Sequence, residues 1–146
     1  MKILLFLLGL VLLFGSAQAA ETAIGSINTV HGEAFILRAD QRIAARVGER
    51  LHQGDRLRTG PASALGVVLR DDTLLSLGAH SEAEINEFLF EPHNGRLSLA
   101  LRLLRGMASF VSGQIARLAP EAVKIETPVG MIGIRGTRFL VKVAGD

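Results

Sequence analysis

Four histidines are the side chains of this sequence best suited to metal binding or acid–base chemistry. They are His31, His52, His80 and His93, and no two of them have the close spacing of paired zinc ligands. The sequence has no cysteine that could complete a mixed site. We therefore predict no metal site and no cofactor.

The acidic residues occur in pairs, but their surroundings favour structural roles over catalysis. Asp71 and Asp72 stand between two apolar segments, where acidic residues are typical of a turn. Glu82 and Glu84 alternate with apolar residues, as on the solvated face of a strand. The sequence contains no nucleophile elbow, phosphate-binding loop or dinucleotide fingerprint, and the G-x-x-G spacing at Gly130 has no phosphate-binding helix after it. We predict a protein without catalytic residues.

Gly54 and Asp55 begin a short polar segment that ends at Thr59 and Gly60. We expect Asp55 to accept backbone N–H groups of its own turn. A calcium or magnesium site would require several more oxygen ligands, and no Asp-rich loop supplies them. The segment is therefore predicted to be structural.

Arg135, Gly136 and Thr137 form a second group with chemical potential. Gly136 would permit a positive φ or a close backbone approach, and Thr137 can hydrogen-bond to local backbone. The rigid fork of donors on Arg135 could clamp carbonyl groups or a carboxylate. Since no nucleophile or base accompanies them, we predict a structural turn, with binding as the alternative.

The segments that must position these residues are short and are separated by glycines, which is typical of an all-β domain. Residues 67–69 and 73–77 are predicted to form a hairpin around Asp71 and Asp72. A β-bulge is expected near Asn86, where the alternation of apolar residues shifts by one. Four arginines stand at even-numbered positions: Arg38, Arg42, Arg46 and Arg50. In a strand, such positions lie on the same face, which predicts one basic strand face.

Leucines at alternate positions from Leu97 to Leu103 favour a strand, although Leu97, Leu101 and Leu104 also fit helical spacing. We choose the strand because Gly106 and residues 107–112 offer a second extended segment directly after it. No segment has convincing helix caps at both ends. A solenoid and a sandwich remain equally compatible with the pattern, because no fixed repeat is visible.

The N-terminus has the pattern of a secretory signal peptide. Lys2 precedes an apolar run over residues 3–14, and Ala17-Gln18-Ala19 follows as a small-x-small site. We predict a signal peptide over residues 1–19, cleavage between Ala19 and Ala20, and one domain over residues 20–146. An uncleaved anchor is the alternative. Cleavage would leave no stable membrane anchor, and without cysteine no lipid can be attached at such a residue. The expected location is the periplasm.

The bulk composition excludes an obvious nucleic-acid partner. The formal net charge is +2, and it would fall to +1 on loss of Lys2. That balance does not require an anionic polymer or membrane as a partner. The sequence has no tryptophan or tyrosine, and phenylalanines in such an aliphatic chain are more typical of a core than of a stacking surface for bases.

Three segments in order resemble the FecR-type domain family. Residues 48–60 (GERLHQGDRLRTG) resemble its opening motif, which includes Gly54, Asp55, Thr59 and Gly60. Residues 64–77 resemble its next strand, acidic turn and strand. Residues 127–139 (TPVGMIGIRGTRF) resemble its closing motif, with the matching positions Thr127, Pro128, Arg135, Gly136, Thr137 and Phe139.

The resemblance implies an extracytoplasmic, mainly β domain with parallel-strand, solenoid-like character. It also implies a role in relaying contacts between envelope proteins, as in family members that sense an outer-membrane transporter and control a sigma factor. Only two residues precede the apolar run, and the sequence extends a few residues past the closing motif. We therefore expect neither a cytoplasmic anti-sigma segment nor a second transporter-docking module.

These observations predict an exported, single-domain, all-β, non-catalytic module that binds another envelope protein or acts as a signalling accessory. An exposed strand edge or a solenoid face would make the contact. The alternatives are a structural homo-oligomer of the envelope and a small-ligand carrier. A large apolar surface patch would favour the first two, and a pocket lined by histidine and arginine would favour the carrier.

Overall fold

The structure, a computed structural model, describes residues 22–144. The predicted signal peptide over residues 1–19 and its cleavage site between Ala19 and Ala20 lie outside the described residues. Within the described part, no helix has both the length and the apolar character needed to cross a membrane.

Strands make up 59% of the structure and helices 9%, which confirms the all-β prediction. The strands are β1 (Gly25–His31), β2 (Ala34–Arg38), β3 (Gln41–Ala44), β4 (Arg50–Leu51), β5 (Arg56–Thr59), β6 (Ala64–Leu69), β7 (Leu74–Leu77), β8 (Glu82–Glu91), β9 (Arg96–Val111), β10 (Val123–Thr127), β11 (Gly130–Gly133) and β12 (Arg138–Val143). Within residues 22–144, one short α-helix, α1 (Gln114–Leu118), and the 3₁₀ turns η1 (Pro92–Asn94) and η2 (Pro120–Ala122) complete the structure.

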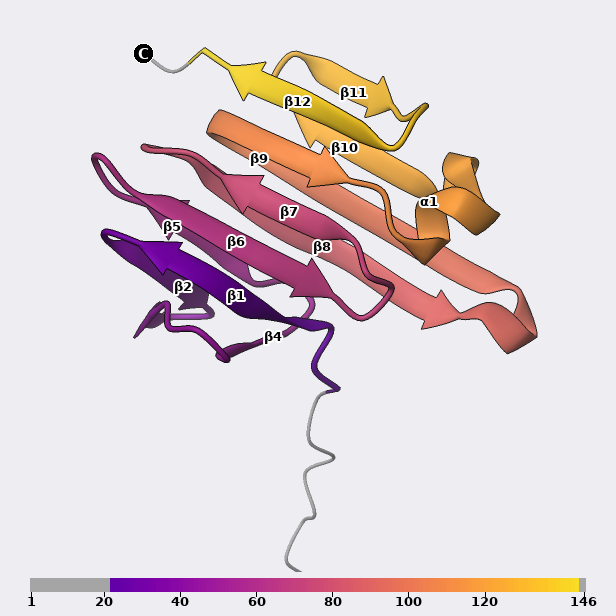
Figure 1. Ribbon diagram of the computed structural model, residues 1–146, viewed down its shortest axis with the longest axis horizontal. Helices are drawn as coiled ribbons and strands as arrows, with labels where there is room; N and C mark the ends of the chain where they lie inside the picture. The colour runs from indigo at the N-terminus through magenta and orange to yellow at the C-terminus, as the bar shows by residue number, and fades with distance from the viewer. Residues whose placement is uncertain (1–21, 145–146) are drawn as a thin grey trace, which may run out of the picture.

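The strands form a curled sheet whose two halves face each other (Figure 1). One half has the order β4-β1-β6-β7-β9, and the other has the order β3-β2-β5-β8-β9, so that β9 belongs to both. At the far side of β9, β12 joins the first half, and β10 with β11 joins the second. The core lies between the halves, because alternate residues of each strand point inward.

The parallel-strand, solenoid-like character implied by the family resemblance is wrong for this chain. All described strand pairs are antiparallel except β9 with β10. The reason is the length of the connections, because tight turns join strands into hairpins while parallel pairing requires a longer crossover. Among the described connections, the segment between β9 and β10, which contains α1 and η2, is the one that leads to a parallel pair.

The predicted hairpin, bulge and leucine-rich strand are all present. Strands β6 and β7 pair in antiparallel register around Asp71 and Asp72. The register of β8 against β9 shifts between Ile85 and Glu87, which is the bulge expected near Asn86. Leu99, Leu101 and Leu103 are buried on β9.

Strand β9 bends at Gly106 and thereby connects the two halves. Residues before the bend pair with β8 and β10, and residues after it pair with β7 and β12. Gly106 has φ +85°, a backbone conformation that glycine adopts without strain. Buried Ser81 holds the bend, because its Oγ accepts the Met107 N–H at 2.9 Å.

The prediction of one basic strand face for four arginines is wrong. Strand β2 ends at Arg38, and Ala39 has φ +51°, so the chain reverses before β3 begins. Arg42 on β3 then lies over the ring of Phe35, with its guanidinium carbon 3.7 Å from the ring centroid. Residues four positions apart share a strand face only while the strand continues, and the turn at Ala39 and Asp40 ends β2 between the first two of these arginines.

Candidate functional site

The opening motif forms a buried ionic turn. Asp55 is 1% exposed, and its carboxylate accepts Arg38 Nε at 2.8 Å and Arg38 Nη2 at 2.7 Å. The same carboxylate accepts the backbone N–H of His52 at 2.8 Å, which closes the turn. Gly54 has φ +89° and supplies the left-handed backbone of this turn. Asp55 thus links β2 to the start of β5, and both of its carboxylate oxygens accept hydrogen bonds from the protein.

Thr59 and Gly60 join the two halves of the sheet at the end of β5. The buried Thr59 hydroxyl donates to the Gly78 carbonyl at 2.6 Å and accepts the Ser81 N–H at 2.9 Å. The Gly60 N–H donates to the Glu33 carbonyl at 2.9 Å. These bonds fix the loop between β7 and β8, where Ser81 reaches the bend of β9.

Glu82 is not on a solvated strand face as predicted, because it is only 7% exposed. Its carboxylate lies 3.3 Å from Arg56, 3.2 Å from Arg58 and 3.4 Å from Arg105. Strand neighbours on β5 and β9 bring these arginines to it, as the antiparallel register requires. Alternation along one strand cannot show this burial, because the three arginines come from two neighbouring strands.

The closing motif runs from the turn before β11 through β11 and the following segment to the first two residues of β12. The Thr127 hydroxyl donates to the Gly130 carbonyl at 2.9 Å, across a turn that contains the exposed Pro128. Ser112 fixes the other end of the motif. Its hydroxyl donates to the Gly136 carbonyl at 2.9 Å and its N–H donates to the Thr137 carbonyl at 2.8 Å.

Phe139 and Arg135 have opposite environments in this motif. The Phe139 ring stacks on buried Phe110, with centroids 4.9 Å apart, and so anchors β12 to β9. Arg135 is exposed and forms no hydrogen bond or ion pair within residues 22–144. Among the described residues, Arg135 therefore clamps neither a carbonyl group nor a carboxylate, although its donors could do so. The carbonyl groups of Gly136 and Thr137 are instead bonded to Ser112.

We expect Gly136→Val to lower the free energy of unfolding by about 1–2 kcal/mol, and Arg135→Ala to change it by less than about 0.5 kcal/mol. Gly136 has φ +105°, which valine adopts only with strain, but an added Cβ would meet no atom within 4 Å. Urea unfolding followed by circular dichroism measures both. A loss above about 1 kcal/mol for Arg135→Ala would contradict the exposed position of this side chain.

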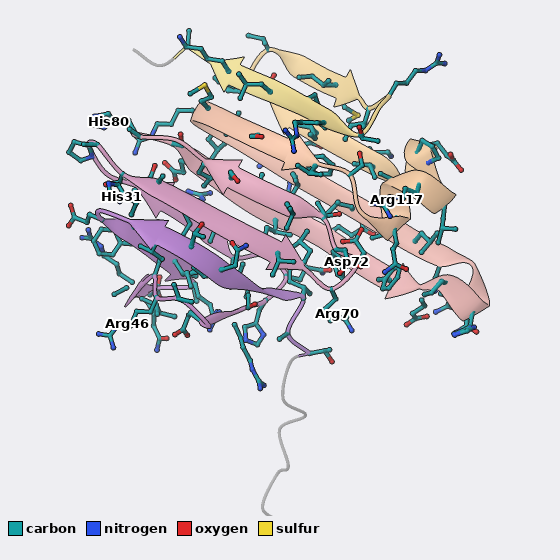
Figure 2. All side chains as sticks on the ribbon, viewed as in Figure 1. His31, Arg46, Arg70, Asp72, His80 and Arg117 are labelled. Carbon is teal, nitrogen blue, oxygen red and sulfur yellow. The ribbon has the colours of Figure 1, made fainter. Side chains whose placement is uncertain are left out.

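The two motifs lie apart and do not build a common chemical site. The opening motif bonds within β2, β5 and the β7–β8 loop, whereas the closing motif borders β11 and β12. Figure 2 places His31 and His80 at the loops of one end of the sheet and Asp72 and Arg117 near its other end. Within residues 22–144, no group of three histidine, aspartate or glutamate side chains could hold a metal ion.

The surface feature that stands out is an open edge, which we define as β11 and β12. Among the described strands, β11 pairs only with β10 and β12 only with β9. Both strands lie side by side at the top of Figure 1. Exposed apolar side chains gather on them and on the preceding turn: Val129 (95% exposed), Met131 (61%), Ile132 (37%) and Leu140 (64%).

Two hollows flank the segment that connects the strands of the open edge. The larger, of about 760 Å³, lies over β10 and β11 and is lined in part by Lys124, Met131 and Arg135. The smaller, of about 360 Å³, lies between β11 and β12 and is lined in part by Ile132 and Phe139. Neither is lined by a histidine.

The sequence model of the family described as FecR protein matches residues 55–146. This chain belongs to the FecR family. The match begins at Asp55 and includes the closing motif and both strands of the open edge. A comparison with curated proteins and a comparison with solved structures each found no significant match.

Membership of the FecR family places the protein among typically periplasmic, signalling-related domains of a regulatory, non-enzymatic kind. Strands β1 to β4 precede the matched region, yet β1 pairs with β6 and β2 pairs with β5. The FecR-matched strands therefore depend on the preceding strands to complete both halves of the sheet.

Proposed function

We propose that this FecR-family protein is an exported, non-catalytic module that holds another envelope protein by adding one of its strands to β12. The observation that carries the proposal is the open edge, where one side of β12 has no neighbour among the described strands and exposed apolar side chains gather. Folded proteins usually cover or shorten such edges, because unpaired N–H and C=O groups accept another strand. Export would use residues 1–19 and release the chain at Ala20.

The backbone of β12 has the alternation that strand addition requires. The Ser112 N–H donates to the Thr137 carbonyl, and Phe139, Val141 and Val143 follow at the same parity. In an antiparallel pair, residues of this parity point their N–H and C=O groups toward the partner strand. The residues between them therefore point these groups away from β9, toward the free side. A partner strand would find its hydrogen-bonding groups at Arg138, Leu140 and Lys142.

The two alternatives have weaker support. A homo-oligomer would use the same apolar edge, but it must bring like charges together, as argued below. A small-ligand carrier would use the larger hollow, which has Lys124 and Arg135 at its wall but lacks the histidine expected for such a pocket. Both alternatives give distinct outcomes in the experiment that follows.

We expect a photo-crosslinking amino acid at Lys142 to capture one specific envelope protein in cells, whereas the same amino acid at exposed Arg46 does not. Leu140→Pro should lower the capture from position 142 at least about ten-fold, because proline removes the outward N–H. That N–H does not contribute to the β9 ladder, so the fold should remain. Mass spectrometry identifies the partner and also reads the mature N-terminus.

Three outcomes would contradict the proposal. Equal capture from positions 142 and 46, or capture that Leu140→Pro leaves unchanged, would remove the open edge from the mechanism. Capture of the protein itself would establish the homo-oligomer. Tight binding of a metabolite by the purified protein, with no capture above background, would establish the carrier.

A further inference from the structure

The outward face of β12 combines one apolar side chain with two cations. Arg138, Leu140 and Lys142 are exposed and alternate with Phe139 and Val141, which point inward. Within residues 22–144, neither cation forms an ion pair or hydrogen bond. A strand added at the free side would therefore bond to the backbone of these three residues. The side chains directly opposite them would lie beside theirs on the outer face.

The rest of the open edge has the same sign of charge. Lys124 and Arg135 line the larger hollow and are exposed. Glu126 on β10 is already paired with Arg102, at 3.1 Å. Glu121 is the acidic residue that lines this hollow, so the described surface around β11 and β12 has an excess of positive charge.

This charge pattern disfavours a second copy of the chain as the added strand. In a symmetric antiparallel pair centred on Leu140, Arg138 of one copy would lie opposite Lys142 of the other. In a parallel pair in register, each cation would lie beside the same cation of the copy. Like charges directly opposite each other destabilise a strand pair, whereas opposite charges stabilise it. The same geometry therefore selects a partner strand with carboxylates at these two positions.

We infer that the open edge of this protein selects an acidic β-strand with carboxylates opposite Arg138 and Lys142 and an apolar residue opposite Leu140. The inference rests on the proposed function, since it specifies the chemistry of the strand added to β12. Arg138 and Lys142 are four positions apart on β12, with Leu140 midway. The two carboxylates of the partner strand must therefore also stand four positions apart, with the apolar residue midway between them.

The intervening positions of the partner strand are also specified. Their side chains point to the inner side of β12, where the hollow of about 360 Å³ lies against Ile132, Ile134, Phe139 and Val141. Apolar side chains would fill this space and remove apolar surface from water. The recognised segment therefore reads acidic, apolar, apolar, apolar, acidic.

Three fluorescein-labelled peptides with matched flanks test the inference by fluorescence anisotropy with the full protein. Their cores are Glu-Val-Leu-Val-Glu, Gln-Val-Leu-Val-Gln and Lys-Val-Leu-Val-Lys. We expect the acidic peptide to bind at least about ten-fold more tightly than the basic one at low salt. The difference should shrink as salt is added, because the charge pairs are exposed.

Matched variants show whether β12 is responsible. Arg138→Glu with Lys142→Glu should reverse the preference, while Arg46→Glu, whose side chain is remote from β12 in Figure 2, should leave it unchanged. Equal binding of all three peptides, abolished by Leu140→Pro, would overturn the charge selection and leave the proposed function intact. Failure of every peptide to bind at about 1 mM would overturn both the inference and the strand-addition mechanism.

Discussion

Gly106→Val is expected to lower the free energy of unfolding by about 3–5 kcal/mol, because it combines a strained backbone with a steric clash. Gly106 has φ +85°, which a β-branched residue does not adopt without strain. A Cβ at this position would also collide with Ser81, whose Cα would lie only 2.5 Å away. Ser81 is fully buried and bonded to Met107, so it has no free space into which to move.

Gly95→Val separates the two contributions to this expected loss. Gly95 has φ +67°, yet a Cβ there would meet no atom within 4 Å. We expect this control to cost only about 1–2 kcal/mol, the strain alone. Urea unfolding followed by circular dichroism is suitable, because the sequence has no tryptophan or tyrosine for fluorescence. Equal losses for the two variants would show that β9 can bend without the close approach to Ser81.

Asp71→Ala is expected to lower the free energy of unfolding by about 3 kcal/mol, because several buried donors lose their partner. The Asp71 carboxylate accepts the Thr73 N–H at 3.1 Å, the Thr73 hydroxyl at 2.8 Å and the Ile115 N–H at 3.1 Å. Asp71 and Thr73 are both 0% exposed, so water cannot replace these bonds in the folded state. The carboxylate therefore joins the β6–β7 turn to the start of α1.

The neighbouring acidic residue provides the control. Asp72 is exposed, and its carboxylate accepts one solvent-exposed hydrogen bond from the half-buried Gln114 side chain, at 3.1 Å. Asp72→Asn retains a residue type that tolerates its φ of +68°, and we expect a change below about 0.5 kcal/mol. A similar loss for the two variants in thermal or urea unfolding would mean that the buried network does not stabilise the fold.

Local pattern was sufficient for much of the fold. The β6–β7 hairpin, the bulge in β8 and the strand over Leu99, Leu101 and Leu103 follow from alternation and turn residues, and each is present. Alternation predicts these elements because one face of each strand must be apolar to meet the core. The helix α1 has no such signal, since it has five residues and no side-chain cap within the helix. Asp71 supplies that contact from a distant turn.

The candidate site was less accessible to prediction from the sequence. The sequence predicts an exposed strand edge as one means of contact, but nothing along the chain shows which strand lacks a neighbour. The motif residues Asp55 and Thr59 have partners 17 and 19 or more residues away, which appear only once the strands pair. The environment of Arg135 was also open, because Ser112 approaches the R-G-T segment from 24 residues away.

The residues of this chain by themselves determined its all-β class, its principal hairpin and its membership of the FecR family, because these depend on local alternation and on motif spacing. Tertiary structure decided the antiparallel curl, the burial of Glu82 among three arginines and the gathering of Met131, Ile132 and Leu140 on one open edge. Each of these depends on which strands become neighbours, and that choice is made by packing of the whole core around the bend at Gly106.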